Sequence, residues 1–162
     1  MPERSSNPIK ASCVQYDSME PTLSAGSDVI GDHSYYAKNK PKRWEVVVFS
    51  LAREGKSGSE AGHYVKRIIG LPGETIHLTP EGLKINGATV QVPPILKDRF
   101  SSFRHHSEHK FGNEPYKVPA DTVFVIGDNQ KVYVADSREF GSVPIRNLEA
   151  RVLASVHTNL IT

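Results

Sequence analysis

The sequence predicts a mostly β fold with short helices, and three observations lead to that prediction. Segments rich in valine, isoleucine and aromatic residues recur along most of the 162 residues. The dipeptide Asn86-Gly87 lies between two such segments, LKI and ATVQV, and it is the strongest short-range hairpin signal. No segment keeps a helical apolar period for three turns.

The first half of the chain contains four predicted strands. Two short ones are expected at 9–15 and 28–31, and two buried ones at 44–51 (WEVVVFSL) and 63–71 (HYVKRIIGL). Between the first pair, Asp17 and Glu20 have the spacing of a helix capping box, which predicts a short helix near Ser18. Pro21 follows at once and prevents a long helix, because proline lacks the backbone N–H.

The second half continues with a hairpin and two further strands. Strands are expected at 74–79 and 82–85, before the Asn-Gly turn, and then at 122–126 and 149–157. Two segments are predicted to be irregular: a polar Gly/Ser-rich loop at 52–62 and an excursion at 93–119 with prolines, charges and three histidines. We therefore expect one domain over 1–162, with a core at 9–72 and 118–157 and an inserted hairpin and loop region at 73–117.

Composition narrows the function classes. The net charge of +2 gives no reason to expect a nucleic-acid partner, and Cys13 is the only cysteine, so no intramolecular disulfide can form. The first 13 residues have no apolar h-region, and no apolar run approaches the roughly 20 residues of a membrane helix. We expect a soluble chain without a signal peptide or transmembrane helix, and its compartment stays open.

Ser18 and Lys66 are the candidate catalytic residues. A free serine hydroxyl is a weak nucleophile and needs a neighbouring base. A lysine can be that base when burial favours its neutral form. Alternation along a strand places Tyr64, Lys66 and Ile68 on one largely apolar face. The alternative is a lysine at the edge of a strand whose ammonium reaches water.

Four blocks in order resemble the type I signal peptidases, a family of serine/lysine endopeptidases. They are SMEPTL (18–23), RWEVVVF (43–49), YVKRIIGLPGE (64–74), and VPADTVFVIGDN (118–129) followed by ADSREFGSVP (135–144). The resemblance implies a signal-peptidase-like β-sheet fold with short helices and an irregular inserted region. It also implies that the whole chain is one catalytic domain.

The resemblance assigns roles to individual residues. Ser18 would be the nucleophile and, through its backbone N–H, an oxyanion donor, and Lys66 would be the general base. Met19 would shape the substrate cleft, and Pro21 would redirect the chain after Ser18. The supporting residues would be an Asp136–Arg138 ion pair together with Asp128 and Ser137.

The sequence departs from the family pattern at several positions. Tyr16 stands where many members have serine or glycine next to the oxyanion site; its phenol could donate a hydrogen bond there, but we expect it to pack. Val134 takes the place of a serine that often orients the lysine, and Trp44-Glu45 replaces a usual Gly-Asp. Family members are usually membrane-anchored, with an extracytoplasmic catalytic domain. This chain starts seventeen residues before Ser18, so either an anchor was removed or the protein is a soluble relative.

The expected partner is a pre-protein or signal-peptide substrate cut after small residues, with a membrane surface or membrane-anchored partner as a further expectation. No cofactor, metal or nucleic acid is expected. Residues 105–109 (HHSEH) fit a zinc-peptidase pattern, but without a helical apolar stripe we expect a polar loop. Two alternatives stay open: a self-cleaving Ser/Lys regulator of the SOS-repressor type, and a non-catalytic peptide-binding module on the same fold.

Overall fold

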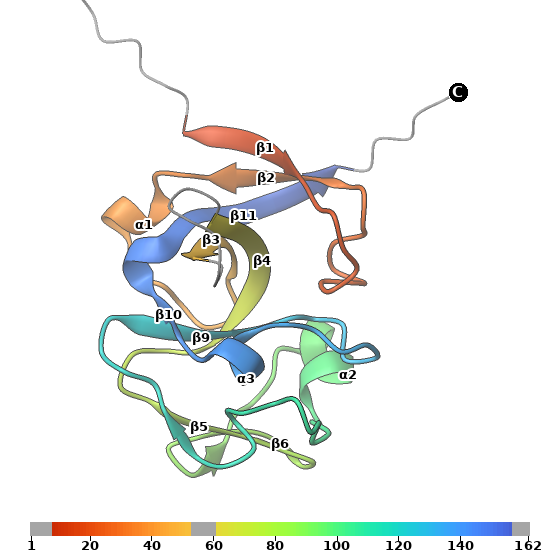
Figure 1. Ribbon diagram of the computed structural model, residues 1–162, viewed down its shortest axis with the longest axis vertical. Coiled ribbons are helices and arrows are strands. Elements are labelled where there is room, and N and C mark those ends of the chain that lie inside the picture. Colours follow the sequence, from red (N-terminus) through yellow and green to blue (C-terminus); the bar gives the residue numbers. More distant parts are fainter. Residues whose placement is uncertain (1–7, 53–60, 157–162) are drawn as a thin grey trace, which may run out of the picture.

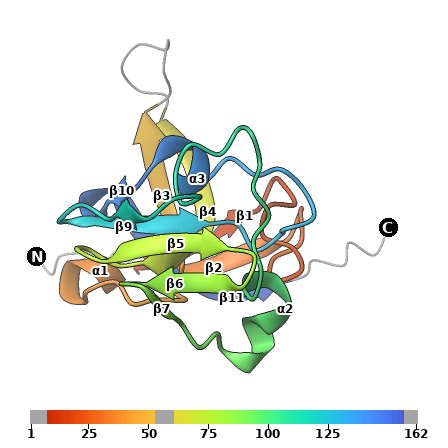
Figure 2. The ribbon, with the colours of Figure 1, turned by 90° about the horizontal axis from the view of Figure 1, so that it is seen from below.

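The computed structural model describes residues 8–52 and 61–156, and these form a mostly β fold of two antiparallel sheets (Figure 1). The larger sheet has seven strands in the order β1-β2-β11-β3-β4-β9-β10, and the smaller has four in the order β7-β6-β5-β8. All strands of the smaller sheet come from the range 73–117, whereas the larger sheet is built from residues before and after it. Figure 2 shows the smaller sheet from below, with β5 and β6 nearest the viewer.

The larger sheet joins distant parts of the chain. β4 pairs with β3 on one side and with β9 on the other, so it lies in the interior of the sheet. Its strands are β1 (Ile9–Cys13), β2 (Asp28–Asp32), β3 (Val46–Ala52), β4 (Ala61–Gly70), β9 (Thr122–Ile126), β10 (Val143–Pro144) and β11 (Leu148–Val156).

The smaller sheet contains the predicted Asn-Gly hairpin. Asn86 and Gly87 both have positive φ, 51° and 84°, as a two-residue hairpin turn of this type requires. The hairpin joins β6 (Gly82–Ile85) to β7 (Ala88–Thr89), which is shorter than the segment ATVQV indicated. β5 (Thr75–Thr79) and β8 (Tyr116–Lys117) complete the sheet.

Helices are short, as expected. They are α1 (Tyr35–Lys38), α2 (Lys97–Phe100) and α3 (Ser137–Phe140), with 3-10 turns at Pro94–Leu96 and Ile145–Asn147. α2, one 3-10 turn and β8 lie within the predicted irregular excursion at 93–119.

Several predicted element bounds need correction. β1 ends at Cys13 rather than at 15, and β3 begins at Val46 rather than at 44, because Trp44 has a φ of 75° that a strand cannot contain. The predicted loop at 52–62 overlaps strands at both ends, at Ala52 and at Ala61. Its residues 53–60 and the predicted strand end at 157 lie outside the described residues.

The central strands of the larger sheet are buried on both faces, which explains their continuous apolar runs, whereas the edge strand β1 is exposed. Ile69 of β4 packs into a cluster between the two sheets, whereas its neighbour Ile68 packs into a cluster on the opposite face. In the same way Phe124 and Val125 of β9 face opposite clusters. The neighbouring charged residues Lys66 and Arg67 of β4, which point to opposite faces, are therefore both buried.

Candidate active site

Ser18 lies in a hydrogen-bonded turn between β1 and β2, and the short helix predicted there is wrong. The amide of Glu20 donates to the Asp17 carbonyl over 3.1 Å, and the amide of Leu23 donates to the Met19 carbonyl over 2.9 Å. Residues 18–22 form turns rather than a helix. Pro21, in the middle of them, has no N–H to donate, so a regular series of helical hydrogen bonds cannot form.

The turn is fixed from two sides. On the inner side Met19 is fully buried in an apolar cluster with Val14, Leu23 and Val29, so it supports the turn from inside. On the other side the Asn129 amide donates to the Ser18 carbonyl over 3.0 Å, and the Asn129 side chain donates to the Asp17 carbonyl over 3.0 Å. These contacts join the Ser18 turn to the loop that follows β9.

Lys66 extends from the middle of β4 into a buried position. Only 5% of the residue is exposed, and its register partner on β3 is Val47, which is fully buried. The ammonium nitrogen lies 5.9 Å from the ring centre of Tyr64, the neighbour that strand alternation places on the same face. The edge-of-strand alternative, in which the ammonium reaches water, does not describe this lysine.

The side chains of Ser18 and Lys66 meet across 48 residues of sequence. Lys66 Nζ lies 2.8 Å from Ser18 Oγ, at hydrogen-bond distance. Burial lowers the pKa of the Lys66 ammonium to about 8, with Arg138 acting in the same direction and Asp136 and Asp128 opposing it. A large fraction of Lys66 is therefore neutral in mildly alkaline solution, and only a neutral amine can accept a proton from serine.

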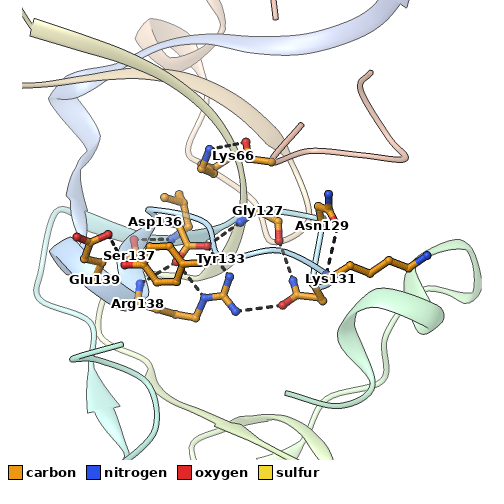
Figure 3. A network of polar contacts seen from close by, with 12 residues as sticks. Lys66, Gly127, Asn129, Lys131, Tyr133, Asp136, Ser137, Arg138 and Glu139 are labelled. Carbon is orange, nitrogen blue, oxygen red and sulfur yellow. Dashed lines mark hydrogen bonds and ion pairs between the residues drawn. The ribbon is translucent and has the colours of Figure 1, made fainter. Parts of the chain in front are cut away.

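Asp136 and Arg138 form an ion pair at the start of α3. Arg138 Nη2 lies 2.7 Å from Asp136 Oδ2, and both side chains are buried. Asp136 also caps α3 by accepting from the Arg138 amide, and it accepts from the Gly127 amide over 3.0 Å (Figure 3). Ser137, fully buried, accepts from the Val125 amide. These contacts hold α3 against the end of β9, directly beside the Ser18 turn.

Asp128 has a buried partner that sequence reasoning missed. Arg67 Nε and Nη2 donate to the two carboxylate oxygens of Asp128 over 2.8 and 2.7 Å, and Arg67 Nη1 donates to the Trp44 carbonyl. The Thr22 hydroxyl also donates to Asp128, which connects this pair to the Ser18 turn. The sequence contained one signal for this pair. Arg67 lies on the opposite face from Lys66 of a strand predicted to be buried, and a buried charge needs a partner.

Tyr16 and Val134, two residues that depart from the family pattern, lie in different surroundings. Tyr16 does not pack as expected: the residue is 74% exposed. Val134 is buried next to Gly127, where its aliphatic side chain offers no hydrogen bond to Lys66. In the described part of the chain, Ser18 is the residue that accepts a hydrogen bond from Lys66 Nζ.

Residues 105–109 lie in an irregular loop. The rings of His106 and His109 lie 4.8 and 5.6 Å from the Tyr133 ring, and burial lowers the pKa of His109 to about 4. Within 8–52 and 61–156 no group of three or more histidine, cysteine or acidic residues is arranged to hold a metal ion.

Comparisons with known proteins agree on one family. The family model described as "Signal peptidase, peptidase S26" matches residues 6–157. Signal peptidase I of Leptolyngbya laminosa is 33% identical over 153 residues, covering 89% of this chain and 66% of its own. Signal peptidase I V of Bacillus subtilis is 31% identical over 135 residues, covering 81% and 76%.

A third relative, signal peptidase I of Bacillus amyloliquefaciens, is 36% identical over 120 residues, covering 73% of this chain and 60% of its own. The chain thus spans 60 to 76% of the length of these three relatives. A solved signal peptidase I from Enterococcus faecalis has a TM-score of 0.49 and 28% identity, covering 72% of this chain and 98% of its own. Among the described residues, no helix has the length and apolar character needed to cross a membrane.

Proposed function

The chain belongs to the signal peptidase family, and from that premise we propose that it is a serine endopeptidase with Ser18 as nucleophile and Lys66 as general base. Its proposed substrates are pre-proteins or signal-peptide-like segments cut after small residues. The observation that carries the proposal is the 2.8 Å separation between Ser18 Oγ and the Nζ of a buried lysine. A buried amine is a useful base because desolvation favours its neutral form.

The proposed reaction has two halves. Neutral Lys66 takes the Ser18 proton as Oγ attacks the scissile carbonyl, and protonated Lys66 then gives that proton to the leaving amine. The product of this half is an ester between the substrate and Ser18. Lys66, neutral again, takes a proton from water as that water attacks the ester; the acid product leaves, and Lys66 returns the proton to Ser18 Oγ.

The remaining site residues support this chemistry in our proposal. The Ser18 backbone N–H would donate to the oxyanion, and the exposed phenol of Tyr16, two residues earlier, would be free to contact the substrate. Met19 would shape the cleft from beneath, and Pro21 would direct the chain away from it. Asp128, Asp136, Ser137 and Arg138 would position the loop beside Ser18.

The direct test is cleavage of a synthetic peptide carrying a small-x-small sequence by the purified chain, followed by mass spectrometry. We expect one cut after the second small residue, and none in a matched peptide with leucine at that position. Incubation of the chain alone tests the self-cleaving regulator: fragments of the chain without peptide cleavage would favour that alternative. Binding of the peptide without any cut would favour the non-catalytic module.

The pH dependence of cleavage should reflect Lys66. Because the neutral amine is the reactive form and its pKa is about 8, kcat/KM is expected to rise about tenfold per pH unit below pH 8 and to level off above it. The measurement is a kcat/KM profile from pH 5 to 10. An inflection of the kcat/KM profile near pH 6.5, the usual pKa of histidine, would contradict the assignment of Lys66 as general base.

Gly127 is expected to be needed for the position of Ser18. A Cβ at this residue would lie 2.7 Å from the Ser18 carbonyl oxygen and 2.9 Å from Val134. Gly127→Ala should therefore displace Ser18 and lower kcat by roughly 10- to 100-fold, since small displacements of reacting groups have effects of this size. Gly87→Ala in the distant hairpin is the control, because it strains a positive φ and lowers stability without touching the site. Equal effects of the two substitutions on kcat would contradict the prediction.

A further inference from the structure

Thr22 is the last residue of the Ser18 turn, and it attaches that end of the turn to the loop that follows β9. Its hydroxyl donates to the buried carboxylate of Asp128. At the other end of the turn, Asn129 donates to the carbonyls of Asp17 and Ser18. Both ends of the turn that carries the serine are therefore attached to two adjacent residues of one loop.

The same carboxylate connects the turn to the strand that carries the proposed base. Arg67 donates to the two oxygens of Asp128 over 2.8 and 2.7 Å, and its neighbour on β4 is Lys66. Lys66 Nζ in turn lies 2.8 Å from Ser18 Oγ. The contacts form a closed ring through Ser18, Thr22, Asp128, Arg67 and Lys66. The separation of the two reacting atoms therefore depends on every contact in the ring, including the single one made by the Thr22 hydroxyl.

Arg99 of α2 fixes the direction of the Thr22 hydroxyl. Its Nη1 donates to Thr22 Oγ1 over 2.7 Å, and only 16% of the arginine side chain is exposed. A hydroxyl has one hydrogen to donate and also accepts, so the guanidinium on the accepting side directs that hydrogen towards Asp128. Both contacts involve an ionised partner, and such hydrogen bonds are stronger than neutral ones. The hydroxyl is therefore held in one orientation.

We propose that Thr22 is a positioning residue for the serine nucleophile. Held between Asp128 and Arg99, its hydroxyl fixes the end of the turn. The turn so fixed keeps Ser18 Oγ within hydrogen-bond distance of Lys66 Nζ. The inference rests on the proposed peptidase function, and it predicts an effect on the rate of the chemical step rather than on the affinity for the peptide.

The test replaces the hydroxyl of Thr22 and measures kcat and KM on the small-x-small peptide. Thr22→Val keeps the shape of the side chain, and kcat should fall by roughly 10- to 100-fold, because a displacement of reacting groups by about 1 Å has an effect of this size. KM should stay within about twofold of the parent value, since no contact with the peptide is removed. Thr22→Ser keeps the hydroxyl and should recover most of kcat.

Thr79→Val is the matched control, because it makes the same change at a buried hydroxyl outside the site. Thr79 Oγ1 donates to the Gly82 carbonyl over 2.9 Å within the smaller sheet. This substitution should lower the temperature of thermal unfolding and leave kcat unchanged. A loss of kcat that came from weaker folding alone would appear in both valine variants.

Arg99→Met tests the other partner of the hydroxyl, and it carries the test if Thr22→Val does not fold. It removes the donor to Thr22, so kcat should fall by about 3- to 10-fold with KM unchanged, the factor that corresponds to one hydrogen bond. Arg99 Nε is buried without a partner in the described part of the chain, so the substitution also removes an unsatisfied donor, which limits the loss of stability. Arg104→Met, at an exposed arginine of the same inserted region, should keep the parent kcat.

The outcomes separate this inference from the proposed function. If the parent does not cut the peptide, the peptidase proposal fails and the inference falls with it. If the parent cuts the peptide and folded Thr22→Val or Arg99→Met keeps the parent kcat, the peptidase stands and the positioning role is overturned. The positioning role is also overturned if the loss in Thr22→Val appears in KM, if it equals the loss in Thr79→Val, or if Thr22→Ser recovers none of it.

Discussion

Cleavage is expected to fall by at least about 10³-fold when Lys66 is replaced by methionine, because general-base catalysis alone contributes factors of this size. Methionine has nearly the length of lysine and keeps the packing against Val47 and Tyr64 but cannot accept a proton. Ser18→Ala should have at least as large an effect, since it removes the nucleophile itself. The measurement is kcat on the small-x-small peptide at pH 9, where the parent is mostly in its reactive form.

The same substitution separates a catalytic loss from a folding loss. At pH 7 burial of the charged Lys66 ammonium lowers the free energy of unfolding of the parent. Lys66→Met should therefore be as stable as the parent or more stable by roughly 1–3 kcal/mol. As pH rises from about 8 to the unfolded value near 10.5, the unfolded parent binds more protons than the folded one. The stability of the parent therefore rises over this range, and the advantage of the variant shrinks. An inactive variant that is also less stable at pH 7 would indicate a structural role for Lys66.

The second large effect is expected on stability, at the buried pair of Arg67 and Asp128. Asp128→Ala would leave the Arg67 guanidinium, on a residue only 7% exposed, without its carboxylate. Loss of one member of a buried ion pair lowers the free energy of unfolding by about 3–5 kcal/mol. Urea unfolding followed by circular dichroism measures this change.

Two variants serve as controls for the buried pair. Glu149→Gln removes a partner from the exposed pair with His63 and should change the free energy of unfolding by less than about 1 kcal/mol. The double variant Arg67→Met with Asp128→Leu removes both charges and should recover a large part of the loss. Equal losses for Asp128→Ala and Glu149→Gln would show that burial does not strengthen the Arg67–Asp128 contact.

The structure also gives a physical reason for one departure from the family pattern. The resemblance indicates a glycine where Trp44 lies, and Trp44 has a φ of 75°, in the region that glycine adopts most easily. Its carbonyl accepts from Arg67, and its ring packs 5.8 Å from that of Phe100 in α2. This backbone conformation, which favours glycine, is adopted here by a residue with a large side chain that packs against α2.

Several strands, one hairpin and the two candidate catalytic residues could be predicted from the sequence. Strand periodicity located β3, β4, β5, β6 and β9, and the Asn-Gly pair located the hairpin, because these signals depend on neighbouring residues only. The order of the four blocks pointed to Ser18 and Lys66 as candidates, and alternation along one strand placed Lys66 on an apolar face.

Pairing across long stretches of chain was decided by tertiary structure alone. The two-residue strands β8 and β10 are too short to have a period, and they exist because β5 and β9 supply partners. The helix signal at Asp17 and Glu20 gave way to turns held by contacts to Asn129. Arg67 pairs with Asp128, 61 residues later in the chain, and Arg99 of α2 donates a hydrogen bond to Thr22, 77 residues earlier. A buried charge must be satisfied somewhere in the fold, but the sequence does not say by which residue, because that depends on which strands lie side by side.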